Sequence, residues 1–153
     1  MKVEPRAFWD QYVQPAIVDW CHYESDVRRA TVALCELDNF AEHMLLFLDP
    51  SLAGRGMISG ARDSLCARVP ALGIARDIHE THKHGRLSRK TATIVAPPDV
   101  EEVWDFFPPG GDLPSTELWI KDDAGSRHEL SAIIWQCRDY WQAELVRNGL
   151  LDD

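Results

Sequence analysis

Three of the six histidines and five Lys or Arg side chains fall in one short stretch, residues 76–90, here called the basic segment. It holds only two carboxylates, Asp77 and Glu80, so its formal charge is +3, whereas the whole chain carries -9. Imidazole changes its protonation near neutral pH, and clustered cations attract anions. The sequence therefore predicts that anion binding, proton transfer or metal ligation, if the chain does any of these, occurs in this segment.

The spacing within the basic segment suggests how such chemistry could be arranged on a helix. Arg76, His79 and Lys83 fall within a sector of about 60° at helical periodicity, and His82 falls on the apolar side. An arginine can hold a phosphate through two hydrogen bonds, and a nearby histidine can transfer a proton. The alternative is that these charged side chains simply end a surface helix, with His82 hydrogen-bonded at the edge of the core.

The first seven residues of the basic segment, Arg-Asp-Ile-His-Glu-Thr-His, read as an arginine, a polar residue, four further residues and a histidine. This pattern resembles the signature of the HEPN superfamily, helical-bundle domains common among prokaryotic toxin and antiviral ribonucleases. The resemblance implies a homodimer that cuts RNA without metal, with Arg76 stabilising phosphate, His82 as acid/base and Asp77 as the orienting polar group. It also admits non-catalytic members that serve as binding or dimerisation modules. In either case His79, Lys83, His84 and Arg86 would help to bind RNA or another phosphate-bearing ligand.

A metal site is a third hypothesis, although no cofactor is expected. His79 and His82 are three residues apart, a spacing that can chelate zinc, iron or nickel on a helix. Asp38 could complete such a site, because it falls inside the apolar stripe of another helix, where a carboxylate is costly unless it is paired or ligated. The alternative for Asp38 is an ion pair with Arg76 or Lys83, or a hydrogen bond from His82 or a tryptophan.

Helical periodicity, with apolar residues three and four apart, predicts the elements that would position these residues. Four main helices and a short helical piece are expected: 5–20, 25–48, 70–84 and 131–147, with the short piece at 61–69 and Ser25 and Ser131 as caps. Pro15 should kink the first helix or restart it, and Gly85 should end the third. The third helix carries the His cluster on its last two turns.

Between the third and the last helix the pattern changes to that of strands. Strands are expected at 90–96, 117–121 and 127–130, the last two joined by a hairpin turn at 122–126. The stretch with Trp104, Phe106 and Phe107 is predicted to be a helical turn or an apolar flap. Trp9, Trp20, Trp135 and Trp141 should pack in the core. The predicted fold is mainly α, a four-helix bundle with a small antiparallel β insertion before the last helix, in a single domain over residues 1–153.

Composition limits the remaining choices. Hydrophobic residues make up 45% and charged residues 27% of the chain, values ordinary for a folded protein. No apolar run is long enough to cross a bilayer, so a cytoplasmic protein without membrane contact is expected. The four cysteines show no pairing pattern. We therefore expect a HEPN-like helical domain with a basic anion-binding site; ribonuclease, non-catalytic homodimeric binding module and metal-binding bundle remain the alternatives.

Overall fold

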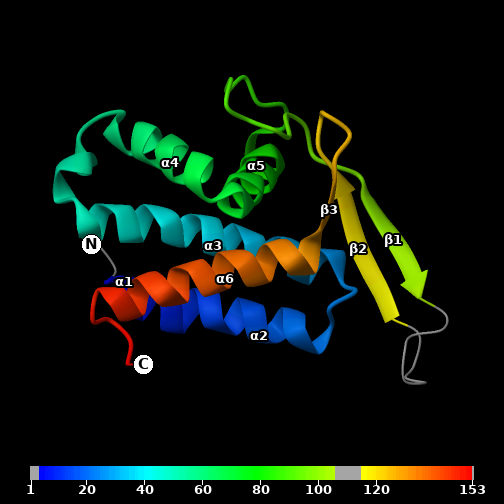
Figure 1. Ribbon diagram of the computed structural model, residues 1–153, viewed down its shortest axis with the longest axis horizontal. Helices are drawn as coiled ribbons and strands as arrows, with labels where there is room; N and C mark the ends of the chain where they lie inside the picture. The colour runs from blue at the N-terminus through cyan, green and yellow to red at the C-terminus, as the bar shows by residue number, and fades with distance from the viewer. Residues whose placement is uncertain (1–3, 106–114, 153) are drawn as a thin grey trace.

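The computed structural model describes residues 4–105 and 115–152. The chain is mainly helical and has a small antiparallel sheet before the last helix, as the sequence predicts (Figure 1). The elements are α1 (Pro5–Phe8), the π-helical η1 (Trp9–Val13), α2 (Gln14–His22), α3 (Val27–Leu48), the 3-10 turn η2 (Pro50–Ala53), α4 (Met57–Arg68), α5 (Pro70–His84), β1 (Val100–Asp105), β2 (Ser115–Lys121), β3 (Arg127–Glu129) and α6 (Leu130–Arg147). Within these described residues no helix is long and apolar enough to cross a membrane.

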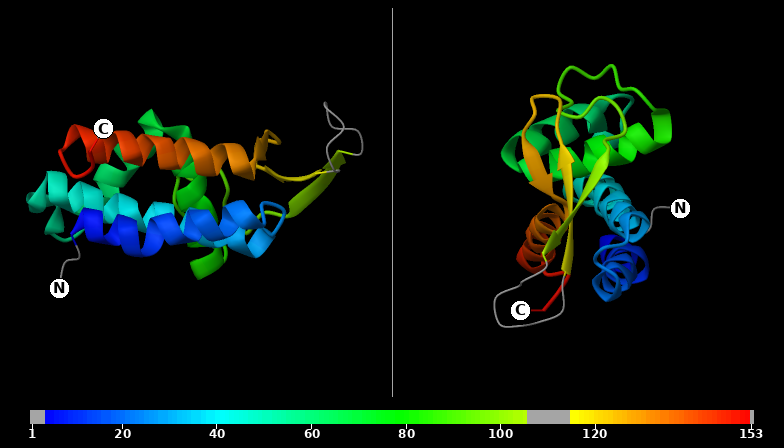
Figure 2. Two further views of the ribbon diagram at one scale, coloured as in Figure 1. Left: turned by 90° about the horizontal axis from the view of Figure 1, so that it is seen from below. Right: turned by 90° about the vertical axis from the view of Figure 1, so that its right-hand side faces the viewer.

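The arrangement of the helices does not confirm the predicted four-helix bundle. α1, η1 and α2 follow one another without a break, and α2, α3 and α6 lie side by side along the longest axis of the molecule (Figures 1 and 2). α5 packs on both α3 and α6 but crosses them, and α4 lies against α3 and α5. α4 is also longer than the short piece expected. The bundle is therefore not confirmed, whereas the helical class is.

The core lies between these helices and is rich in aromatic side chains. Trp9, Trp20 and Trp141 are fully buried, as predicted, and Phe40 packs edge-on against Trp141. Trp135 was expected in the core as well, but its side chain is 38% exposed. Its ring touches the ring of the buried Trp20 edge to face, so Trp135 lies at the boundary of the core.

Local signals set the helix ends, with two corrections. Ser131 does not cap the last helix, because α6 begins at Leu130, and its N-cap Glu129 makes no side-chain capping hydrogen bond. The side chain of Asp26, and not that of Ser25, accepts a hydrogen bond from the Arg29 amide at 3.0 Å and caps α3. Gly85 follows α5 with φ 73°, a conformation that glycine adopts without the strain a side chain would bring. α5 therefore ends where the sequence predicts, and the second half of the basic segment continues as a loop.

The sheet differs from the prediction in its first strand. Residues 90–96 form no strand; instead β1 is Val100–Asp105 and pairs antiparallel with β2, which pairs with β3. The amides of Thr93 and Ile94, which a strand partner would need, donate to the carboxylate of Asp77 on α5. Trp104 lies in β1, not in a helical turn or flap, while Phe106 and Phe107 lie outside the described residues. The sheet lies at the end of the long helices where α6 begins (Figure 1).

Candidate functional site: a buried charge network, an exposed basic loop and a cavity

Arg76 lies inside the protein and is bonded to two carboxylates. Its exposed fraction is 3%. Nη1 donates to Asp63 Oδ1 on α4 at 2.7 Å, and Nε donates to Glu80 Oε1, one turn further along α5, at 2.9 Å. Burial acts to lower the pKa of Arg76, but these two hydrogen bonds outweigh it and raise the pKa above its usual value. The guanidinium is therefore charged, and its described hydrogen bonds go to carboxylates of the protein itself.

Asp38 on α3 is buried, as its place in the apolar stripe predicts, and it is paired. Its Oδ1 accepts from Arg62 Nη2 at 2.5 Å, and its Oδ2 lies 2.8 Å from His79 Nδ1. Burial raises the pKa of Asp38, but the hydrogen bond from His79 and the charge of Arg62 together hold the pKa below its usual range. The sequence predicts Arg76, Lys83, His82 or a tryptophan as the partner of Asp38. The described partners are instead Arg62 from α4 and His79 from α5.

Asp77 fixes the loop that follows α5. It is 2% exposed, and its Oδ2 accepts from the Thr93 amide at 2.8 Å, the Thr93 hydroxyl at 3.0 Å and the Ile94 amide at 3.1 Å. Its Oδ1 accepts from Arg89, whose Nη2 also lies 3.2 Å from Glu80 Oε2. The described partners of Asp77 are thus Thr93, Ile94 and Arg89, and no histidine is among them.

These interactions join into one set that we call the charge network. It contains four carboxylates, three guanidinium groups and one imidazole, namely Asp38, Asp63, Asp77, Glu80, Arg62, Arg76, Arg89 and His79. Its members come from α3, α4, α5 and the loop after α5. The near balance of opposite charges makes burial tolerable, and the network ties α3, α4, α5 and the loop after α5 to one another.

The other residues of the predicted site lie on the outside. His82, Lys83, His84 and Arg86 are exposed, and no described hydrogen bond or ion pair includes them. The prediction that His82 faces the apolar side is wrong: Thr81, one residue earlier, takes the buried position, and its hydroxyl bonds to the Ile78 carbonyl. Within one chain the structure thus places Arg76 inside and His82 outside, and does not bring the two together.

The structure brings together two of the three ligands of the metal hypothesis. His79 and Asp38 are in contact, but His82 is exposed and belongs to no described cluster with them. Across residues 4–105 and 115–152, no group of three or more His, Cys, Asp or Glu side chains is placed to hold a metal ion.

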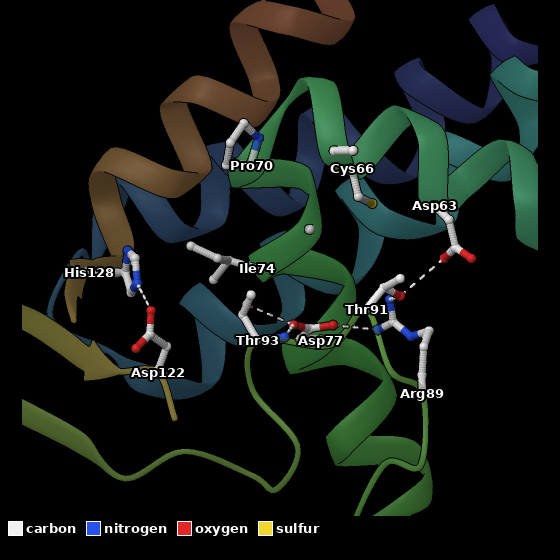
Figure 3. A pocket seen from close by; sticks show the side chains of 12 residues that line it. Asp63, Cys66, Pro70, Ile74, Asp77, Arg89, Thr91, Thr93, Asp122 and His128 are labelled. Carbon is white, nitrogen blue, oxygen red and sulfur yellow. Dashed lines mark hydrogen bonds and ion pairs between the residues drawn. The ribbon is translucent and has the colours of Figure 1, made fainter. Parts of the chain in front are cut away.

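A cavity of about 340 Å³ lies beside the charge network, between α4, α5, the loop and the β2–β3 hairpin (Figure 3). Its polar lining includes Asp63, Asp77 and Arg89 of the network, and its far side carries Asp122 and His128. His128 Nε2 lies 2.9 Å from Asp122 Oδ2, and this hydrogen bond is the largest of the effects that lower the pKa of Asp122. Apolar and small residues form the wall between these ends.

Sequence reasoning missed several of these residues. Arg62, Asp63 and Arg89 look like ordinary charges on polar helix faces or loops, and only their burial distinguishes them. Asp122 and His128 flank the predicted hairpin turn, so their closeness could have been inferred from the turn itself. Comparison of the chain with known protein families, with curated proteins and with solved structures finds no match.

Proposed function

We propose that this protein is a non-catalytic binding module that holds a phosphate-bearing partner, most simply single-stranded RNA, on the outer part of the basic segment. The observation that carries the proposal is the division of the segment's cations. Arg76 and Arg89 are bonded to carboxylates of the charge network, whereas Lys83, Arg86 and Lys90 are exposed and take part in no described ion pair. Arg76 and Arg89 therefore hold the segment against the rest of the protein. Lys83, Arg86 and Lys90 are available to a partner.

The position of the free cations supports binding rather than helix stabilisation alone. The negative end of the α5 dipole stabilises cations in the last turn, which accounts for Lys83 and the two histidines beside it. Arg86 and Lys90 lie beyond the helix end and gain little from this effect, since it acts within about one turn. Both belong to the loop that Asp77 and Arg89 hold in place, so one anionic ligand could be bound by both.

The burial of Arg76 is the reason to propose binding without cleavage. To stabilise a phosphate in a ribonuclease, Arg76 would have to leave Asp63 and Glu80, and two carboxylates would then face the substrate's own negative charge. The HEPN-like assignment and the homodimer stay predictions. Non-catalytic bundle domains of that kind are compatible with this division of the basic segment.

The test is the fluorescence anisotropy of a labelled single-stranded RNA titrated with the protein at several salt concentrations. We expect the triple variant Lys83→Ala/Arg86→Ala/Lys90→Ala to bind at least about tenfold more weakly and to lose about 2 from the log–log salt slope, because each phosphate contact contributes about 0.7. The matched control removes three other exposed cations that no described ion pair includes, Arg28→Ala/Arg55→Ala/Arg68→Ala, and should bind like the wild type.

Two outcomes would overturn this proposal. Equal binding by the two triple variants would mean that the RNA follows no particular surface. Cleavage of the RNA by the wild type, lost in both Arg76→Ala and His82→Ala while these variants stay folded, would establish the ribonuclease hypothesis instead. The sedimentation velocity of the same samples measures whether the chain is a homodimer.

A further inference from the structure

We propose that the cavity between α5 and the β2–β3 hairpin binds a small aliphatic diamine, that is, two ammonium groups joined by a short hydrocarbon chain. The inference is independent of the RNA proposal, because it concerns a different surface and a ligand of opposite charge.

A carboxylate lies at each end of the cavity, Asp63 from α4 at one end and Asp122 from the hairpin at the other (Figure 3). Both described hydrogen bonds to Asp63 reach Oδ1, so they leave Oδ2 able to accept. In Asp122, Oδ1 accepts the amides of Ala124 and Ser126, and Oδ2 accepts only from His128. Each end therefore retains a charged acceptor for a donor that carries several N–H groups, which is what an ammonium offers.

The wall between the two ends is apolar. Pro70, Gly73 and Ile74, from the first turns of α5, line it together with Ala67 of α4. Such a wall suits methylene groups, whose removal from water is favourable, while Asp77, Thr91 and Thr93 line the rest of the cavity. A volume of about 340 Å³ is near the lower limit of small-molecule sites, about 300 Å³, which fits a compact ligand better than a nucleotide.

The charges around the cavity favour a cation. Three carboxylates line it, those of Asp63, Asp77 and Asp122. Arg76 is bonded to Asp63 and Arg89 to Asp77, so among the described contacts Asp122 alone has no guanidinium partner and the surplus charge is negative. His128 lies beside Asp122 and adds a positive charge only when it is protonated. A phosphate or carboxylate ligand would meet a carboxylate at both ends, whereas each ammonium group of a diamine would have a carboxylate to bind.

The test is isothermal titration calorimetry of the full chain with 1,4-diaminobutane, compared with 1-aminobutane and 1,4-butanediol. The diamine should bind at one site per chain and at least about tenfold more tightly than the monoamine, since it alone reaches both carboxylates, and the diol should not bind. The comparison is needed because a chain of net charge -9 attracts any cation weakly.

Two variants locate the ligand. Ala67→Phe adds a ring to the wall of the cavity from an exposed position on α4, so it should abolish diamine binding without disturbing the charge network. Asp63→Asn should weaken binding about tenfold, because it removes the charge at one end. Asp139→Asn is the matched control: Asp139 is an exposed, arginine-paired carboxylate on α6 and does not line the cavity.

The proposal is overturned if the diamine binds no better than the monoamine, if it does not bind at all, or if Ala67→Phe binds it like the wild type. RNA binding by the exposed cations is read from a separate titration, so failure of one proposal leaves the other standing. Thermal unfolding of each variant, measured without ligand, identifies a variant that has lost its fold.

Discussion

Arg76 on α5 donates to Asp63 on α4 at 2.7 Å, and this pair holds the arginine of the HEPN-like pattern inside the protein. Glu80 holds the same guanidinium from the other side at 2.9 Å. The arginine that a short pattern would assign to catalysis thus joins two helices. The exposed histidine of the same pattern, His82, has no described part in this arrangement.

Asp77→Ala should release the loop after α5. The amides of Thr93 and Ile94 lose the carboxylate that accepts them, and Arg89 loses a partner. We expect hydrogen exchange at these two amides to rise at least about tenfold, since each lost hydrogen bond is worth about 1 kcal/mol or more. Thr93→Val is the control, because it removes only the hydroxyl bond. Unchanged exchange in Asp77→Ala would mean that the loop is held by other contacts.

Asp38 should make stability depend on pH in the acid range. The pKa of this buried carboxyl lies below its usual value in the folded protein, so its stabilising effect is present above the unfolded pKa of about 3.9 and is lost as the pH falls through the folded pKa. The wild type should therefore be more stable than Asp38→Asn at pH 6, and the difference in unfolding free energy should shrink below about pH 4. A difference that stays constant down to pH 3 would contradict this assignment.

Two glycines should respond to alanine in opposite directions. Gly60 lies within α4, and a Cβ there would meet nothing within 4 Å, so Gly60→Ala should stabilise the protein by about 1 kcal/mol. Gly85 has φ 73°, and Gly85→Ala should destabilise it by about 1 kcal/mol. Urea unfolding measures both. If Gly85→Ala were neutral, α5 would not end in the left-handed region.

The thiols should react with a disulfide reagent in an order set by burial. Cys21 is exposed and should react first, and Cys21→Ser should remove this fast phase. Burial raises the pKa of Cys35 to about 11, so only about one thiol in a thousand is ionised at pH 8 and the reaction is slow. Cys137 is buried and should react only on unfolding. A fast reaction of Cys137 in the native protein would contradict the packing around α6.

The sequence predicts the long helices well because their signals are local. Gly85 ends α5 as expected, and the apolar stripe of α3 correctly indicates that Asp38 is buried. Its partners could not be predicted, because they depend on how α4 and α5 cross α3. That crossing follows from the packing of whole helix faces, and no short pattern contains it. Arg62 is the clearest case, since nothing in its neighbourhood distinguishes it from an exposed arginine.

The wrong strand at 90–96 and the misplaced His82 have physical reasons as well. Alternation predicts a strand only if the amides find a strand partner, and here the Asp77 carboxylate takes two of them. His82 lies at the edge of the apolar sector of α5, where Thr81 meets the core instead. A threonine whose hydroxyl bonds to its own helix is easier to bury than an imidazole.

The measurement that tests the central claim most directly is urea unfolding of Arg76→Ala beside His82→Ala. If Arg76 is part of the buried charge network, its loss leaves the half-exposed Asp63 without its guanidinium partner and removes one of the guanidinium groups that contact Glu80. Glu80 keeps Arg89 and Arg62 beside it, so the loss falls mainly on Asp63, and the unfolding free energy should fall by about 3 kcal/mol, the lower end of the range for a broken buried ion pair. His82→Ala should change it by no more than about 0.5 kcal/mol. Wild-type stability in Arg76→Ala would contradict the structural role of Arg76 and return it to the candidates for catalysis.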